Sequence, residues 1–113
     1  MINVVVTGGR DYLESSKVFT ILSSFNINHL YVGDAIGADQ AAREWAGYHG
    51  ISMTVFNADW AKYGKSAGPI RNGEMLDAAG NDAIVVAFLG GHGTKNCVNQ
   101  AHERGMIVLR VEE

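Results

Sequence analysis

Short apolar runs alternate with helical segments along this chain, and the alternation limits its possible folds more than any other feature. The five runs are rich in β-branched residues and cover residues 2–6, 29–33, 51–56, 83–89 and 106–111. Strands that alternate with helices form parallel sheets with helices on both faces. Since such crossovers are right-handed, the sequence predicts an α/β fold: a single Rossmann-like three-layer sandwich with a mainly parallel five-stranded sheet.

Apolar residues between the runs recur at helical spacing. The first expected helix carries Val18, Phe19, Ile21, Leu22 and Phe25, and the second carries Ala38, Ala41, Ala42, Trp45 and Ala46. Both sets place their apolar side chains on one face of a helix. Pro69 is expected in the first turn of a third helix, with Arg71 in the same turn. Thr94 is the expected N-cap of a fourth helix, with Cys97 at its third position.

The composition excludes several classes of protein. The 113 residues suit one domain, taken as residues 1–113, and 47% hydrophobic with 19% charged residues excludes disorder. A net charge of −3 argues against a nucleic-acid partner. With Cys97 as the only cysteine and histidines without ligand spacing, we expect no metal and no cofactor. No apolar run is long enough to cross a membrane and no signal peptide is evident, so we expect a cytoplasmic protein.

Glycine is enriched in the connections that follow the predicted strands. Of the 14 glycines, nine fall in the four strand-to-helix connections. In open α/β sheets these connections form the ligand-binding edge, and glycine lets backbone N–H groups approach an anion there. A tight turn is the alternative explanation for any single loop. The four loops together predict a site for a phosphate-bearing ligand.

The candidate ligand-binding residues come from all four loops. They are Thr7, Gly8, Gly9, Arg10 and Asp11 in the first loop, Gly33, Asp34, Gly37, Ala38 and Asp39 in the second, Gly68, Arg71 and Asn72 in the third, and Gly90, Gly91, His92, Gly93 and Thr94 in the fourth. We expect the Arg10 and Arg71 guanidinium groups on phosphate and the Asp34 carboxylate on ribose hydroxyls.

Several of these residues also have a purely structural explanation. Arg10 either clamps the anion or pairs with its neighbour Asp11 or with another subunit. Asp39 either meets ligand or complements the dipole of its helix. His92 is either a proton donor or a solvated loop residue.

Two aromatic residues and the single thiol have open roles as well. Trp60 or Tyr63, in the long connection 57–68, either stacks on a base or covers the sheet edge as a lid. Cys97 is expected to be a buried structural thiol.

Four motifs in order resemble the small YspA-like branch of the SLOG superfamily. They are Thr-Gly-Gly-Arg-Asp-Tyr at 7–12, Gly-Asp-Ala-Ile-Gly-Ala-Asp at 33–39, the third-loop residues Trp60, Tyr63, Gly64, Ala67, Gly68, Pro69, Arg71, Asn72 and Met75, and Gly-Gly-His-Gly-Thr at 90–94. The resemblance spans nearly the whole chain. It implies a Rossmann-like nucleotide-ligand domain, related to cytokinin-activating phosphoribohydrolases, DNA-processing proteins and sensors of nucleotide signals in phage defence. Members are commonly dimers or larger.

One departure separates this chain from the phosphoribohydrolases. Their Gly-Gly-x-Gly-Thr-x-x-Glu motif ends in a glutamate that works with an upstream arginine. Arg71 matches that arginine, but Cys97 stands at the glutamate position. Cleavage of an N-glycosidic bond needs a carboxylate near the anomeric carbon, by analogy with glycoside hydrolysis. Asp34, Asp39 or Glu74 are the remaining candidates.

The resemblance and the residues together favour a binding module. It holds a nucleotide or nucleotide-derived ligand, such as a nucleoside monophosphate, ADP-ribose or an NAD-related molecule, as a sensor or sequestering domain. The alternative is a nucleoside 5′-monophosphate phosphoribohydrolase with Arg71, Asp39 and Glu74 as catalytic residues. A DNA-processing role is a third hypothesis, against which the acidic balance argues. A homo-oligomer is expected, with Phe25, Trp45 and Tyr48 as an apolar surface.

Overall fold

Five strands and their connecting helices make up a computed structural model that describes residues 1–112. The strands are β1 (Ile2–Thr7), β2 (Ile27–Gly33), β3 (Met53–Phe56), β4 (Ile84–Phe88) and β5 (Ile107–Val111). The longer helices are α1 (Ser15–Ser23), α2 (Ala38–His49), α4 (Ala67–Ala79) and α5 (His92–Glu103), and two short turns, α3 (Trp60–Tyr63) and η1 (Gly64–Ser66), precede α4. The predicted alternation is therefore confirmed.

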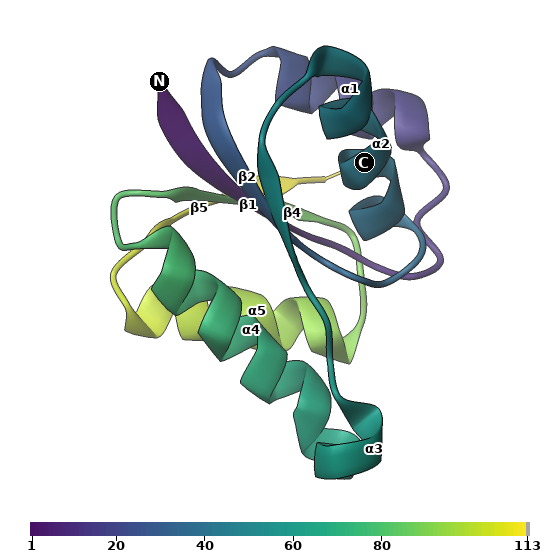
Figure 1. Cartoon of the computed structure of the whole chain (residues 1–113), viewed down its shortest axis with the longest axis vertical. Coiled ribbons are helices and arrows are strands. Elements are labelled where there is room, and N and C mark those ends of the chain that lie inside the picture. The colour runs from purple at the N-terminus through teal and green to yellow at the C-terminus, as the bar shows by residue number, and fades with distance from the viewer. Residues whose placement is uncertain (113) are drawn as a thin grey trace.

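The sheet has the strand order β3-β2-β1-β4-β5, and every neighbouring pair is parallel. The prediction of a mainly parallel sheet thus understated its regularity. Helices α1 and α2 cover one face, and α4 and α5 cover the other (Figure 1). The order reverses between β1 and β4, which places the switch point of the sheet between these two central strands.

The central strand shows why the sheet is buried on both faces. Val4 and Val6 of β1 pack into the cluster under α1 and α2, whereas Val5 points to the cluster under α4 and α5. All three side chains are fully buried. Successive strand residues point to opposite faces, so a continuous apolar run is what a strand between two helical layers requires.

The third connection differs from the predicted open loop. It folds into α3 and η1, because the Asp59 carboxylate accepts a hydrogen bond from the Lys62 N–H at 3.1 Å and caps the first of these turns. The chain then passes directly into α4 at Ala67, two residues before Pro69. Arg71 therefore lies in the second turn of its helix, not in the first as predicted.

The fourth helix also starts earlier than predicted. Gly91 (φ −97°, ψ −139°) takes the N-cap position of α5, and His92 is its first helical residue. Thr94 is the third residue of the helix and not its cap, and Cys97 is the sixth and not the third. The prediction was wrong because glycine can cap a helix without a side chain that marks the position.

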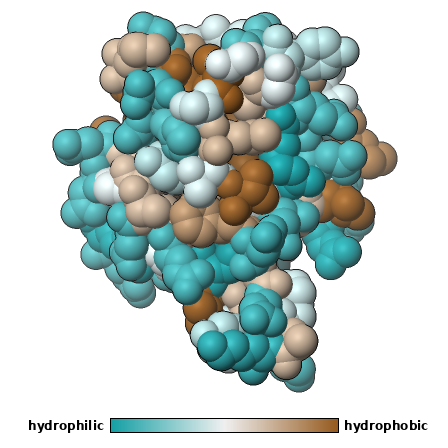
Figure 2. Space-filling view, viewed as in Figure 1, coloured by the Kyte–Doolittle hydropathy of each residue, from teal (hydrophilic) through white to brown (hydrophobic). Residues whose placement is uncertain are grey.

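The surface expected for oligomerisation is not formed as predicted. Trp45 is only 3% exposed, because its ring packs in the core and its indole N–H donates to the Ser23 hydroxyl at 2.9 Å. Tyr48 is widely exposed, whereas Phe25 is half-buried against the core. More apolar surface lies on the edge strand β3, at Met53 and Val55, and Figure 2 shows apolar side chains in the middle of the face that β3 crosses.

Among residues 1–112, no helix combines the length and the apolar character that crossing a bilayer requires.

Candidate functional site

A cavity of about 1120 Å³ opens at the carboxyl edge of the sheet, around the switch point between β1 and β4. Most of the predicted residues line it: Thr7, Gly8, Gly9, Arg10, Asp11, Asp34, Asp39, Gly68, Arg71, Asn72, Gly90, Gly91, His92, Gly93 and Thr94. The structure therefore gathers residues from all four glycine-bearing loops around one space. Its volume exceeds that of many small-molecule sites, so a ligand of nucleotide size fits.

Four predicted residues lie elsewhere. Gly33, Gly37 and Ala38 are beneath the lining, where they pack the second loop against its neighbours. Glu74 is exposed on α4 and is not part of the cavity. As a candidate catalytic group Glu74 is therefore misplaced, because its position on α4 puts it on the solvent side, two residues beyond the inward Asn72.

The sequence interpretation missed part of the lining. Tyr12, Leu13 and Glu14 reach the cavity because α1 begins only at Ser15 and the segment before it passes along the cavity; Lys17, in the first turn of α1, also lines it. Ala35, Ile36 and Leu89 complete the lining that was not predicted. The length of the gap between the β1 run and the first apolar helical residue, Val18, was the signal that could have revealed this segment.

Of the two aromatic candidates, only Trp60 lines the cavity. Its ring lies over Gly68, where an added Cβ would meet the indole at 3.4 Å. Trp60 is 58% exposed, so its side chain is accessible to a ligand. Tyr63 instead lies under the ammonium group of Lys62, 5.0 Å from the centre of its ring.

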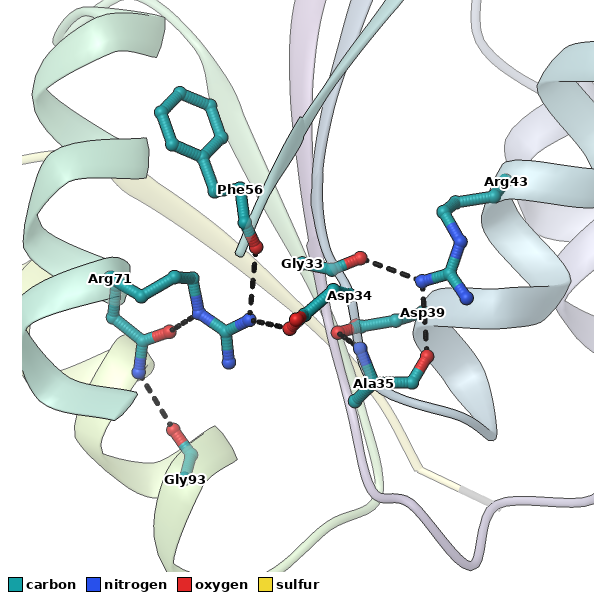
Figure 3. A network of polar contacts seen from close by, with 9 residues as sticks. Gly33, Asp34, Ala35, Asp39, Arg43, Phe56, Arg71 and Gly93 are labelled. Carbon is teal, nitrogen blue, oxygen red and sulfur yellow. Dashed lines mark hydrogen bonds and ion pairs between the residues drawn. The ribbon is translucent and has the colours of Figure 1, made fainter. Parts of the chain in front are cut away.

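Arg71 is held in the cavity wall by three hydrogen bonds from its guanidinium group. Its Nη1 donates to Asp34 Oδ1 at 3.0 Å and to the Phe56 carbonyl at 3.3 Å, and its Nε donates to Asn72 Oδ1 at 3.0 Å (Figure 3). Its Nη2 donates to no residue among 1–112, and no buried side-chain nitrogen there lacks a partner. The Nη2 group is therefore accessible and free to donate to a ligand.

Asn72 connects the Arg71 side chain to helix α5. It is 3% exposed, and its Nδ2 donates to the Gly93 carbonyl and to Asn96 Oδ1, both at 3.2 Å. Because the same side chain accepts from Arg71, it ties the guanidinium on α4 to the first turn of α5. Because the buried Asn72 amide makes three hydrogen bonds, it fixes the position of α4 relative to the start of α5.

Asp39 is a buried carboxyl that faces the cavity. Only 5% of the residue is exposed, and its Oδ2 accepts one long hydrogen bond, from the Ala35 N–H at 3.4 Å. Burial raises the pKa of Asp39 from 3.8 to about 6, although the nearby Arg71 charge, the Ala35 hydrogen bond and the Arg43 charge each lower it. Oδ1 accepts no hydrogen bond from residues 1–112 and is not sealed off, so it is available to a ligand hydroxyl.

Arg43 shapes the loop that carries these carboxylates. Its Nη1 donates to the Gly33 carbonyl at 2.7 Å and to the Ala35 carbonyl at 3.0 Å (Figure 3). Both acceptors lie in the second loop, so one guanidinium from α2 sets its curvature. Sequence reasoning did not single out Arg43, since a charged residue inside an amphipathic helix ordinarily faces solvent.

Close packing explains some of the glycines on the cavity floor. An added Cβ at Gly90 would collide with the Thr94 hydroxyl and approach the Gly9 nitrogen to 2.6 Å, and one at Gly9 would approach the Gly90 Cα to 2.9 Å. The first and fourth loops thus touch through their backbones, where the Gly9 N–H donates to the Leu89 carbonyl at 2.9 Å. Packing explains these two glycines without a ligand.

The glycines of the rim have no such explanation. An added Cβ at Gly91 or Gly93 would meet nothing within 4 Å. Both residues line the cavity and are exposed. Since α5 begins beside them, the N–H groups of its first turn have no acceptor within the helix.

Two predicted side chains, those of Arg10 and His92, lie at the rim without a hydrogen-bond or ion-pair partner among residues 1–112. Arg10 makes no ion pair with Asp11 or with any other residue in the described chain, although pairing with Asp11 was one interpretation of the sequence. His92 is exposed at the start of α5.

Cys97 lies beneath the cavity and is fully buried. Burial raises the pKa of the Cys97 thiol from 9.0 to about 11, against the opposing effect of a hydrogen bond with Thr7 and the charge of Arg71. Since the thiolate is the reactive form, this thiol is a poor nucleophile at neutral pH.

The comparison with known proteins agrees with this architecture. The sequence profile described as the YspA, cpYpsA-related SLOG family matches residues 2–63, a segment that holds the first two loops of the cavity. The chain is also similar to the Gene 61 protein of Mycobacterium phage D29. The two are 30% identical over 120 aligned residues, which cover 96% of this chain and 95% of the relative. The chain belongs to the YspA, cpYpsA-related SLOG family.

Proposed function

We propose that the chain binds a nucleotide or nucleotide-derived ligand in the cavity at the carboxyl edge of its sheet. Membership of the SLOG family suggests a nucleotide-related ligand or a related hydrolytic activity. The observation that carries the proposal is the pair of free polar atoms in the lining. Arg71 Nη2 offers a donor and Asp39 Oδ1 an acceptor, while the remaining atoms of both groups are held by the protein.

The mixture of charges in the lining favours a nucleotide over a simple anion. Arg10, Lys17 and Arg71 are positive, whereas Asp11, Glu14, Asp34 and Asp39 are carboxyl groups. A bare phosphate has no use for carboxylates, but ribose hydroxyls donate hydrogen bonds to them. Cations for phosphate and carboxylates for hydroxyls match the two polar parts of one nucleotide.

The three parts of the ligand are assigned as follows. Phosphate binds Arg71, the amides beside Gly91 and Gly93, and Arg10 at the rim. The ribose hydroxyls donate to Asp39 and to the second oxygen of Asp34. The base stacks on the exposed face of Trp60, since a tryptophan ring provides a broad platform for an aromatic base.

Direct titration tests this proposal. Isothermal calorimetry with AMP, ADP-ribose and NAD measures whether any of them binds the purified chain. The Arg71→Ala variant is expected to lose at least about tenfold in affinity, because a charge-assisted contact to phosphate contributes about 1.5 to 3 kcal/mol. Unchanged affinity in this variant would show that Arg71 is not the phosphate ligand.

Arg104 provides a matched control for this variant. Like Arg71, it is partly buried and pairs with an aspartate, since its Nε donates to Asp77 Oδ1 at 2.9 Å. It does not line the cavity. Arg104→Ala therefore removes a comparable ion pair and is expected to leave nucleotide affinity unchanged.

Hydrolysis of an N-glycosidic bond is a second candidate, and the state of Asp39 supports it. A carboxyl with a pKa of about 6 is close to the range in which a general base or acid works at neutral pH. Asp39 comes from α2, whereas the family glutamate position on α5 holds Cys97. Asp39 in this role activates water or stabilises the developing cation at the anomeric carbon, and Arg71 holds the phosphate.

Chromatography of the incubated ligand separates the two candidates. Free adenine from AMP, present with the wild-type chain and absent with Asp39→Asn, supports the hydrolase. Tight binding with AMP recovered intact supports the binding module. The matched Glu74→Gln variant is expected to behave as wild type in both assays, because Glu74 lies outside the cavity.

A further inference from the structure

A second hollow of about 250 Å³ adjoins the main cavity at the carboxyl ends of β4 and β5. The two hollows share Leu89, Gly90 and Thr94 in their linings. The ridge between them is therefore the fourth loop itself, and at Gly90 that ridge has no side chain. A ligand held on one side of this loop is directly beside the space on the other.

The second hollow carries two cations. Lys95 reaches it from α5 and Arg110 from β5, with the Asn99 amide beside them. Glu112 is the one carboxylate among the residues described in this lining. Neither the Lys95 nor the Arg110 side chain makes an ion pair or a hydrogen bond with another residue among 1–112.

The arginines of the chain fall into two groups by their contacts. Arg43, Arg71 and Arg104 each donate to side chains or carbonyls of the protein. The guanidinium groups of Arg10 and Arg110 have no such partner within the described residues, and each residue lines one of the two adjoining hollows. The chain has a net charge of −3, yet each adjoining hollow has a guanidinium group without an ion-pair partner among residues 1–112, and this arrangement suits an extended anionic ligand.

We propose that the second hollow is a subsite for a further anionic group of the ligand. The inference rests on the proposed function: the nucleotide in the main cavity carries a second phosphate that passes over Gly90 and is held by Lys95 and Arg110. The chemical class is a nucleotide with two or more phosphates. A chain of phosphodiesters, as in a nucleic acid, is a different ligand that the experiment below distinguishes.

A series of adenine nucleotides with one or more phosphates tests the subsite. Calorimetry of the whole chain with AMP, ADP, ATP and ADP-ribose measures the gain in affinity that each added group brings. We expect the best of the longer ligands to bind the wild-type chain at least about tenfold more tightly than AMP, since two charge-assisted contacts are added. In Lys95→Ala/Arg110→Ala this gain is lost while AMP affinity stays within about twofold.

The control removes the same charge elsewhere. Lys62→Ala/Lys65→Ala takes two positive charges from α3 and η1, outside both linings, and is expected to keep the full gain. Thermal unfolding confirms that both double variants remain folded. Arg110→Glu is a second variant, in which repulsion makes the longer ligands bind more weakly than to the alanine variant.

Each outcome decides between the two proposals. If AMP binds and the gain is equal in wild type and Lys95→Ala/Arg110→Ala, the subsite is wrong and the proposed function stands. If no nucleotide binds the wild-type chain, both are wrong. If single-stranded oligonucleotides bind in a Lys95- and Arg110-dependent way while ADP, ATP and ADP-ribose show no gain over AMP, the hollow follows a nucleic-acid backbone and the small-ligand subsite is overturned.

Discussion

Two walls of the main cavity are built in opposite ways. The arginine wall, made of Asp34, Asp39 and Arg71, consists of side chains held by hydrogen bonds. Arg71 donates to Asp34 and to the buried Asn72, and Asp39 accepts from the Ala35 N–H. The glycine wall, residues 90–94, consists of backbone that touches the first loop at Gly9 and otherwise opens to the cavity. One wall has its charges compensated before any ligand arrives, and the other presents amides with few side chains in the way.

The two walls also differ in whether the residues needed for stability are the same as those needed for ligand binding. On the arginine wall the same contacts serve both, because Asp39 is buried and the Arg71 side chain is only 13% exposed, so both polar groups need partners in the folded protein. On the glycine wall the two requirements fall on different residues. Gly90 is dictated by packing, whereas Gly93 has open space around it.

The largest expected effect on stability distinguishes Gly90, which packing requires, from the rim residue Gly93, which has open space around it. Gly90→Ala forces a Cβ against Thr94 and the Gly9 backbone, and is expected to lower the unfolding free energy by about 3 kcal/mol. Gly93→Ala meets nothing and lies in the first turn of α5, so its stability is unchanged or up to about 1 kcal/mol higher. Urea unfolding of the two variants measures the contrast.

Ligand titration extends this pair of variants. Gly93→Ala places a methyl group at the cavity rim, and nucleotide affinity is expected to fall although the fold is intact. Equal stability of the two variants would contradict the assignment of Gly90 to packing. Unchanged nucleotide affinity in Gly93→Ala would contradict the role of the rim in binding.

The arginine wall is expected to make stability depend on pH. Because the pKa of Asp39 is raised from 3.8 to about 6, the folded protein holds its proton over a range in which the unfolded chain has lost it. The contribution of this group to stability is therefore present at low pH and is lost as the pH rises from about 4 to 6. A shift of this size corresponds to about 3 kcal/mol.

Asp39→Asn removes this dependence. The difference in unfolding free energy between wild type and variant, measured by urea unfolding from pH 3.5 to 7, is expected to change by up to about 3 kcal/mol in favour of the variant. Asp77→Asn is the control, since Asp77 lies in the exposed pair with Arg104. A pH profile of Asp39→Asn parallel to that of wild type would show that the carboxyl is not held protonated by burial.

Variants of Arg43 test whether its hydrogen bonds to the second loop support the arginine wall. Arg43→Met leaves the Gly33 and Ala35 carbonyls without their shared donor and is expected to cost about 2 kcal/mol. Nucleotide affinity falls with it, because Asp34 lies between these two carbonyls. Arg43→Lys keeps one cationic donor and recovers part of both losses, which chemical unfolding and calorimetry measure in parallel. A variant that keeps full affinity would show that the loop holds its shape without this residue.

The two walls were also predictable from the sequence to different degrees. The strand pattern and the glycines gave the position of the cavity, because parallel strands bring all their carboxyl ends to one edge. Contacts between side chains far apart in the chain were not visible: Arg71 and Asp34 are 37 residues apart, and Arg71 was expected to meet only ligand. Periodicity shows which face of a helix is buried, but not which polar atom a buried arginine reaches.

The start of α5, in the glycine wall, could not be predicted from the sequence either. Gly91 caps the helix without a polar side chain, so the sequence pointed to Thr94, three residues later. The burial of Asp39 is a second case. An acidic residue in the first turn of a helix ordinarily stays in water near the dipole, and only the packing of the second loop around it encloses the carboxyl.

The smallest effect on stability is expected for Asp34→Asn. The same variant gives the sharpest test of how the arginine wall contacts a ligand. The ion pair with Arg71 is partly open to solvent, so Asp34→Asn is expected to cost less than about 1 kcal/mol. Its effect on binding depends on the ligand. Inorganic phosphate is expected to bind about threefold more tightly, since the Arg71 charge is no longer neutralised, whereas AMP binds more weakly because a ribose partner is lost. Calorimetry with both ligands measures the opposite signs. If both affinities rise, Asp34 only neutralises Arg71 and makes no contact with ribose; if both fall, its main task is to hold the guanidinium in place.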